Sequence, residues 1–187
     1  MAKNTYIGIG NMARKVKKMY VGINGVARKV KKAYIGIGNV ARLFFSGGEL
    51  EYVGTITPLS VERYSLAGTH VGSYALFGGG DSYNTVDAYN TSLTRSAPTA
   101  LSTGRAAIAA TTVGNYALFG GGGYSSTSYN TVDAYNTSLT RSTPTALSTA
   151  RRRLAATTVG SYALFGGGRG GSYSYTSYNT VDAYTAD

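Results

Sequence analysis

The strongest constraint on the fold is a long internal repeat in the C-terminal three-quarters of the chain. The segments VGSYALFGGG at 71–80, VGNYALFGGG at 113–122 and VGSYALFGGG at 159–168 are nearly identical, and their first residues are 42 and 46 positions apart. Periods of 20–50 residues are typical of repeat architectures, in which each unit buries an apolar face against the next unit. Each repeat is therefore expected to fold into the same arrangement of elements and to pack against the next repeat.

Each unit predicts four short β-strands separated by turn residues. In the second unit these are RAAIAATTV from Arg105, then YALFGG, TVDAY and LTRSTPTAL. Runs of β-branched and aromatic residues bounded by Gly, Asn and Ser are typical of antiparallel strands. The sequence therefore predicts an all-β fold with one four-stranded sheet in each of three units.

Charge divides the chain into two regions. Residues 1–45 contain ten of the 18 Lys and Arg residues and no acidic residue, whereas residues 46–187 contain eight basic and all eight acidic residues. The formal net charge of +10 thus belongs to the N-terminal region. Such an asymmetry predicts two modules: a basic arm over 1–45 and the repeat module over 46–187.

The arm has its own repeat, with a period of 14 residues. Its copies begin at Tyr6, Tyr20 and Tyr34, and each has a short β-prone run, a Gly-Asn or Asn-Gly pair and a second run. The pair Asn24-Gly25 favours a two-residue hairpin turn. A basic amphipathic helix is the alternative, but frequent glycines destabilise helices. A β-meander or a series of hairpins is the preferred prediction.

The long repeat resembles the Kelch repeat over residues 52–187. The similarity lies in the double glycine that closes a strand, the Val-Asp-x-Tyr that follows, and the Leu-x-x-x-Arg that leads into the next unit. It implies Kelch-like β-propeller blades, three per chain. The Trp expected on the fourth strand is absent, and Arg95 or Arg141 stands near its position. We expect Leu93 and Leu139 to fill the space.

The near-identity of the units, together with the basic repeats before them, also resembles proteins encoded in phages and prophages of gut bacteria. This resemblance implies a structural component of a virion, in a tail or an appendage. The ligand would then be a glycan or a protein on the host surface. Gene neighbourhood would test this implication.

The residues present argue against catalysis. Some Kelch-like proteins are copper enzymes that use His, Tyr and a cysteine-linked Tyr, but this chain has no Cys and one His, His70. That residue occupies the position of Thr112 and Thr158 in the other units, which predicts a tolerated substitution in a strand. We therefore expect no enzymatic activity, no cofactor and no metal site.

An Asp and an Arg recur once in each unit. A general-acid role for the Asp residues is conceivable, but a charge pair repeated by unit is usually structural, linking neighbouring strands. The pairs are Asp87, Asp133 and Asp182 with Arg63, Arg105 and Arg151.

All length variation between units lies in one loop. The spacing from Phe77 to Val86 is 9 residues, and the corresponding spacings in the next two units are 13 and 16. The loops are composed almost entirely of Tyr, Ser, Gly, Asn and Thr, a composition typical of adaptable recognition surfaces. A solvated linker is the alternative. We expect five loop tyrosines, at 124, 129, 173, 175 and 178, to be mostly exposed. The candidate ligand-binding residues are Tyr83, Tyr124, Tyr129, Arg169, Tyr173, Tyr175 and Tyr178.

The arm is interpreted as an anchoring or oligomerisation module that would join the chain to other virion proteins. Binding to nucleic acid through its Lys and Arg residues is the second interpretation. The alternative for the whole chain is a bacterial intracellular scaffold with a protein-binding propeller and a polyanion-binding arm. The N-terminus lacks the apolar run of a signal peptide, and no apolar stretch is long enough to span a membrane. The predicted location is the virion, or the bacterial cytoplasm before assembly.

The limits of the repeat predict how the units complete one another. Residues 59–72 align without a gap to residues 101–114, so residues 52–60 take the place of a blade's fourth strand, whereas VDAY at 181–184 is a third strand with no fourth strand after it. Propellers typically have 4–8 blades, so three blades do not close a ring. We expect a homodimer that closes a six-bladed ring, with strand 52–60 of one chain completing the last blade of the other. Three copies and nine blades are the less favoured ring.

Overall fold

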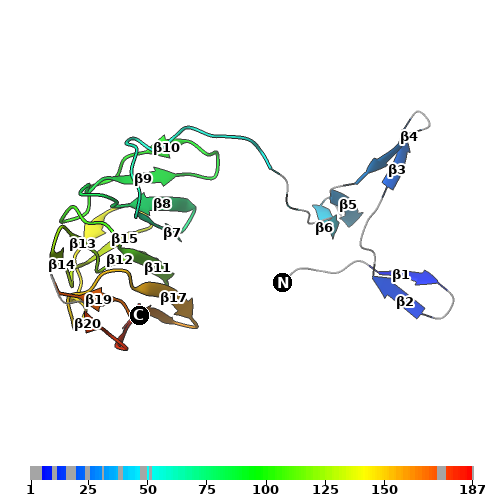
Figure 1. Cartoon of the computed structure of the whole chain (residues 1–187). Coiled ribbons are helices and arrows are strands. Elements are labelled where there is room, and N and C mark those ends of the chain that lie inside the picture. Colours follow the sequence, from blue (N-terminus) through cyan, green and yellow to red (C-terminus); the bar gives the residue numbers. More distant parts are fainter. Residues whose placement is uncertain are drawn as a thin grey trace. The chain divides into compact units, whose positions relative to one another are not determined.

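A computed structural model describes residues 6–9, 12–15, 20–23, 26–30, 32–37, 40–46, 50, 52–171 and 176–186. The described residues form β-strands, turns and loops without any helix, so the predicted all-β class is confirmed. None of them forms a helix that could cross a membrane. The chain divides into two compact units, Met1–Gly54 and Thr55–Asp187, shown in blue to cyan and in cyan to red in Figure 1. The sequence division was placed earlier, at residue 46.

The first unit contains three separate two-stranded antiparallel sheets, one for each 14-residue repeat. Tyr6 and Tyr20 pair with Lys15 and Lys29 in the same register, and Tyr34 pairs with Leu43 after a shift between Ala33 and Tyr34. The structure is therefore a series of hairpins rather than a helix. The expected turn at residues 24–25 lies outside the described residues. The strands are β1 (Tyr6–Ile9), β2 (Met12–Lys15), β3 (Tyr20–Ile23), β4 (Val26–Lys29), β5 (Lys32–Ile37) and β6 (Val40–Ser46).

The second unit contains three larger antiparallel sheets, each from one long repeat (Figure 1). The first sheet has the order β7 (Ala67–Val71), β8 (Tyr74–Gly78), β9 (Val86–Tyr89) and β10 (Arg95–Ser96). The second has the order β11 (Ala109–Val113), β12 (Tyr116–Gly120), β15 (Val132–Asn136) and β16 (Arg141–Ser142). The third sheet has three strands, β17 (Ala155–Val159), β18 (Tyr162–Gly166) and β21 (Val181–Thr185).

The long loops of the second and third repeats add two small hairpins. They are β13 (Gly123–Tyr124) with β14 (Thr127–Ser128), and β19 (Arg169–Gly170) with β20 (Thr176–Ser177). The first strands of the three sheets are neighbours, because β11 contacts both β7 and β17. The sheets thus follow one another in chain order, with the loop after each second strand at one common end (Figure 1).

The structure shows no strand at 52–60 within a single chain, and the pairing of 52–60 with a second copy stays a prediction. Residues 52–60 are extended or bent without strand pairing, and all of them except Leu59 are exposed. The physical reason is that a fourth strand pairs with the third strand of the unit before it, as Arg95 of β10 pairs with Tyr89 of β9. No described sheet of the second unit precedes residues 52–60, so this chain has no third strand for them to pair with.

Two apolar clusters hold the sheets together. One lies between the first and second sheets, the other between the second and third. Each contains a fully buried Phe from the second strand of the later sheet, Phe119 or Phe165. Each Phe also meets the Tyr of its own third strand edge to face, with Phe119 and Tyr135 ring centroids 5.9 Å apart. Edge-to-face pairs of this kind add to the stability from apolar burial.

The predicted charge pairs are confirmed as structural. Nη2 of Arg105 donates to Oδ2 of Asp133 at 2.8 Å, and both side chains are fully buried. The same guanidinium donates to the carbonyl oxygens of Thr103, Phe119 and Gly121. Burial of two charges is tolerated here because the Arg has acceptors on all sides. Equivalent pairs join Arg63 to Asp87 and Arg151 to Asp182.

The position near the absent Trp is filled by charge rather than by leucine. Arg95 and Arg141 donate to the second carboxylate oxygen of Asp87 and Asp133, at 3.1 and 2.8 Å. Leu139 is half-buried against the first apolar cluster, but Leu93 is exposed, so the expectation fails for Leu93. Leu139 packs towards the sheet before its own, and no described sheet precedes that of Leu93.

We expect the two arginines on Asp133 to differ greatly in their effect on stability. Arg105→Met should lower the free energy of unfolding by about 3–5 kcal/mol, because it leaves a buried carboxylate without its buried partner. Arg141→Met is the matched control on the same carboxylate. Since Arg141 is 26% exposed, its loss should lower the free energy by about 0–1 kcal/mol. Urea unfolding measures both, and equal losses would contradict this assignment.

Candidate binding site

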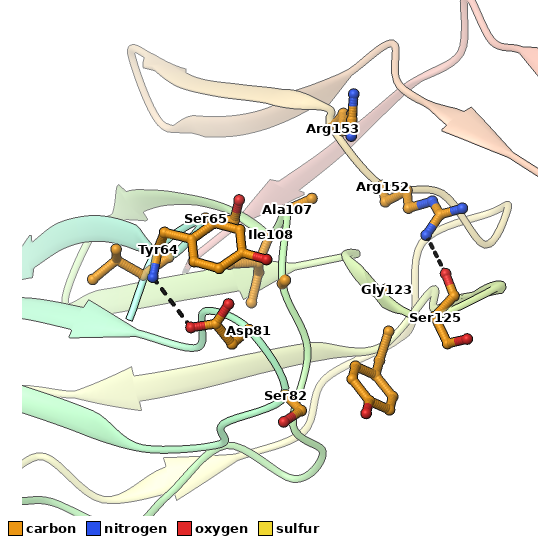
Figure 2. A pocket seen from close by; sticks show the side chains of 13 residues that line it. Tyr64, Ser65, Asp81, Ser82, Ala107, Ile108, Gly123, Ser125, Arg152 and Arg153 are labelled. Carbon is orange, nitrogen blue, oxygen red and sulfur yellow. Dashed lines mark hydrogen bonds between the residues drawn. The ribbon is translucent and has the colours of Figure 1, made fainter. Parts of the chain in front are cut away.

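A cavity in the described part of the chain lies where segments of the three repeats meet. It has a volume of about 600 Å³ and lies in the second unit. Two kinds of segment line it: the connection that leads into the first strand of each sheet, and the start of the loop after the second strand in the first two repeats (Figure 2). The lining residues are Tyr64, Ser65, Leu66, Asp81, Ser82, Ala106, Ala107, Ile108, Gly123, Tyr124, Ser125, Arg152 and Arg153.

Backbone hydrogen bonds join the two kinds of segment within each repeat. The amide of Asp81 donates to the carbonyl of Tyr64 at 3.1 Å. Ala106 and Gly123 form an isolated antiparallel bridge, and Arg152 and Arg169 form the corresponding bridge in the third repeat. The start of each variable loop is therefore fixed to the connection that precedes the sheet.

A second set of backbone bonds joins the connections of successive repeats. The amide of Ala107 donates to the carbonyl of Ser65, and the amide of Arg153 donates to the carbonyl of Ala107, both at 2.9 Å. These bonds place the side chains of equivalent positions side by side along the cavity. The backbone of the cavity is thus held by the repeat itself.

The cavity also concentrates unusual backbone conformations. Seven non-glycine residues of the described chain have positive φ. Five of them line the cavity: Ser65, Asp81, Ala107, Ser125 and Arg153. Each such conformation is unfavourable for an L-residue by about 1–3 kcal/mol and is typical of binding or catalytic sites. The strain marks this cavity as the candidate functional site.

The side chains at these positions differ between the three repeats, whereas the strand sequences YALFG and VDAY are identical in all three. The three residues after the recurring Arg begin Tyr64-Ser65 in the first repeat, Ala106-Ala107 in the second and Arg152-Arg153 in the third. The first loop position is Asp81, Gly123 or Arg169. The predicted site residues all lie in the loops, because that prediction rested on loop length and composition, and none lies in the connection. Comparing the units position by position after Arg63, Arg105 and Arg151 would have found it.

The cavity carries both charged and aromatic groups. The amide of Tyr64 approaches Oδ2 of Asp81 at 3.4 Å on one side, and Nη1 of Arg152 donates to the carbonyl of Ser125 at 2.7 Å on the other (Figure 2). Arg153 is exposed beside them, and Tyr124 is 55% exposed. A polar ligand would find cationic, anionic, hydroxyl and aromatic groups on a fixed backbone.

The predicted site residues are not all brought together. Tyr124 lines the cavity, and Tyr83 is exposed outside its lining. Tyr129, Tyr178 and Arg169 are half-buried, so the expectation of mostly exposed tyrosines fails for Tyr129 and Tyr178. The backbones of both are hydrogen-bonded, since their amides donate to Gly122 and Gly168. Tyr173 and Tyr175 lie outside the described residues.

The recurring carboxylates do not face this cavity. Asp87 is buried between Arg63, Arg95 and the amide of Ser60. Burial raises the pKa of Asp87, but the hydrogen bonds from Arg63 and Ser60 and the charge of Arg63 outweigh it, so the pKa is below its usual value. His70 lies on β7, and its carbonyl accepts a hydrogen bond from the Thr112 hydroxyl. Among the described residues, no three His, Cys, Asp or Glu side chains are grouped to hold a metal ion.

Comparison with known proteins bears on the fold alone. No protein-family model and no curated protein matches this chain. A solved structure titled "Structure of YjhT" is similar to it, with a TM-score of 0.62 and 13% sequence identity. The similarity covers 73% of this chain and 46% of that one, so the chain spans less than half of that structure.

The low pKa of Asp87 predicts a pH-dependent contribution to stability. A carboxylate with a lowered pKa in the folded state stabilises the fold above its unfolded pKa, about 3.9, and loses this effect as the pH falls. Asp87→Asn should therefore be less stable than the wild type at pH 7, with a difference that narrows from about pH 5 to pH 2. Urea unfolding across this range measures it. A difference that does not change with pH would contradict the assignment.

Proposed function

We propose that this chain is a non-enzymatic recognition protein that binds a ligand in the cavity formed by its repeats. One observation carries the proposal. The strand sequences YALFG and VDAY are identical in all three units, whereas residues that line this cavity differ from unit to unit, including Tyr64, Arg152 and Arg153. A repeat that served structure alone would have no reason to concentrate aromatic and charged substitutions there. Variable side chains on a fixed scaffold are typical of recognition surfaces.

The proposal includes the finer description of the fold as Kelch-like propeller blades. The repeated double glycine, the Val-Asp-Ala-Tyr strand and the four-strand order of the first two sheets support it. The absence of enzymatic activity is also part of the proposal. In its support, the recurring carboxylates are held in ion pairs with arginines rather than at the cavity.

The proposed ligand is a glycan or a protein on the surface of a bacterial host. Exposed Tyr rings stack on sugar rings, and the Arg, Asp and Ser groups of the cavity match hydroxyl and carboxylate substituents. The setting of a phage tail or appendage rests on the resemblance of the repetitive sequence to phage-encoded proteins. In that setting residues 1–45 anchor the chain to other virion proteins.

Binding to bacterial surfaces tests this function. The triple variant Tyr64→Ala, Tyr124→Ser and Arg153→Ala should lose most binding to intact gut-bacterial cells or to immobilised capsular polysaccharides. Its thermal unfolding should change little, because these side chains lie at the surface of a cavity whose backbone is fixed by other bonds.

Tyr116→Ser provides the matched control. Tyr116 is 40% exposed, starts the second strand of its sheet and does not line the cavity, so its loss should leave binding intact. Equal losses in both variants would show that the cavity is not the binding site. Failure of the unmodified chain to bind any such cell or polysaccharide would contradict the proposed ligand class.

A further inference from the structure

The two junctions between sheets use one set of equivalent positions. The later-facing side of the first sheet carries Val71, Leu76, Val86 and Ala88, all buried against the second sheet. The equivalent residues of the second sheet, Val113, Leu118, Val132 and Ala134, are buried against the third. We call this side of a sheet its trailing face and the opposite side its leading face.

Each junction also places a phenylalanine ring of the leading face over a glycine of the trailing face. A Cβ atom added to Gly78 would lie 2.8 Å from Cε1 of Phe119, and one added to Gly120 would lie 2.7 Å from Cε1 of Phe165. Such distances leave no space for a side chain. A glycine at this position is therefore required wherever another sheet packs on the trailing face.

Hydroxyl pairs complete each junction. Oγ1 of Thr69 lies 2.8 Å from Oγ1 of Thr112, and Oγ1 of Thr111 lies 2.8 Å from Oγ1 of Thr158. Backbone bonds also cross the junctions, since the amides of Gly80 and Gly122 donate to the carbonyls of Arg105 and Arg151 at 3.0 Å.

The trailing face of the third sheet has all these features but is uncovered by the described residues. Val159 and Val181 are each 59% exposed, whereas their equivalents in the first two sheets are at most 3% exposed. The nearest atom to a Cβ at Gly166 would be Val181 Cγ2 of the same sheet at 3.5 Å, with no phenylalanine nearby. The outer edge of β21 has no fourth strand in the described chain.

The leading face of the first sheet is uncovered in the complementary way. Phe77 is 36% exposed and Leu93 is 44% exposed, whereas Phe119 is fully buried and Leu139 is half-buried in the second sheet. Tyr52 and Val53 are also strongly exposed. Tyr52 and Val53 align with Thr94 and Arg95, at the start of β10, which is the fourth strand of the first sheet.

We propose that the trailing face of the third sheet binds the leading face of the first sheet in a second copy of this chain. Phe77 of the second copy would pack over Gly166, and residues 52–54 of the second copy would pair with β21 as the fourth strand. Because each copy has both faces, two copies can bind reciprocally with two-fold symmetry. This inference is independent of the ligand proposed above.

Two arguments favour the second copy as the occupant. The two faces are formed by equivalent positions of the same repeated sequence. Their shapes and hydrogen-bonding groups therefore match those of the junctions already present twice in the chain. Reciprocal binding would close six sheets into a ring, within the common range of about 4–8.

The arrangement also accounts for the only histidine. His70 occupies the position of Thr112 and Thr158, whose hydroxyls meet Thr69 and Thr111 of the sheet before. In the proposed pair, the imidazole of His70 would face the hydroxyl of Thr157 across the junction between copies. The one departure from threonine at this position would thus lie at the two junctions that join the chains.

The molar mass of the full chain in solution tests the proposal. Light scattering after size-exclusion chromatography should give twice the chain mass of 19.5 kDa for the wild type. Gly166→Leu should give the mass of one chain and an unchanged circular dichroism spectrum. Its side chain has space in the single chain but would occupy the place of the Phe77 ring.

Two control variants separate association from folding. Ser138→Leu adds the same side chain at an exposed turn and should remain a pair. Gly120→Leu makes the same change at the junction inside the chain, where Phe165 leaves no space, and should unfold the second unit. A wild type at the mass of one chain or of three chains would overturn the proposal, as would a Gly166→Leu variant that remains paired.

Engineered cysteines give an independent measurement, because the chain has none of its own. The double variant His70→Cys and Thr157→Cys should form a disulfide between copies under mild oxidation, giving twice the chain mass on a denaturing gel without reductant. Thr69→Cys with Thr112→Cys, whose hydroxyls are 2.8 Å apart in one chain, should cross-link within the chain. If only the control pair forms a disulfide, the proposed junction is wrong.

Discussion

The buried ion pair between the recurring Arg and Asp is the interaction on which the repeat module depends. Arg105 reaches from the connection before the second sheet to Asp133 on the third strand, and it donates on the way to the carbonyls of Phe119 and Gly121. One side chain thus ties the connection, the end of the second strand and the third strand together. An ion pair of this kind tolerates little change, because loss of either partner leaves a buried charge. It fixes the connection, and with it the backbone of the cavity.

The glycines at the ends of the second strands allow neighbouring sheets to pack closely. Gly78 and Gly120 allow the Phe of the next sheet to lie directly on the strand. The following glycines, Gly79 and Gly121, have positive φ and lie close to the carbonyls of Arg105 and Arg151. A side chain at any of these positions would separate the sheets. The double glycine of the first two repeats is therefore a requirement of the sheet junction and needs no explanation from ligand binding.

The sequence predicted the elements of the fold well because the repeat supplied each prediction more than once. The strands at YALFGG and TVDAY and the Arg–Asp pairs follow from positions that recur at the same spacing. The predictions failed where the packing of a residue depends on a neighbouring sheet that the described chain lacks. Residues 52–60 and Leu93 have the sequence of a packed element, yet both are largely exposed because no described sheet precedes them.

The site was harder to predict because backbone hydrogen bonds bring its residues together. These bonds join the connection to the loop, and no sequence motif indicates that the two segments are paired. The differences in loop length led to the prediction of Tyr129 and Tyr178, whose backbone hydrogen bonds hold the loop. They did not indicate Tyr64 and Arg153, which line the cavity. The bridge between Arg152 and Arg169 joins the connection to the loop through backbone atoms. Since both segments are held by bonds between backbone atoms, their side chains contribute little to the fold. These positions can therefore change from Tyr or Ala to Arg without altering the scaffold, which is the property that a recognition surface needs.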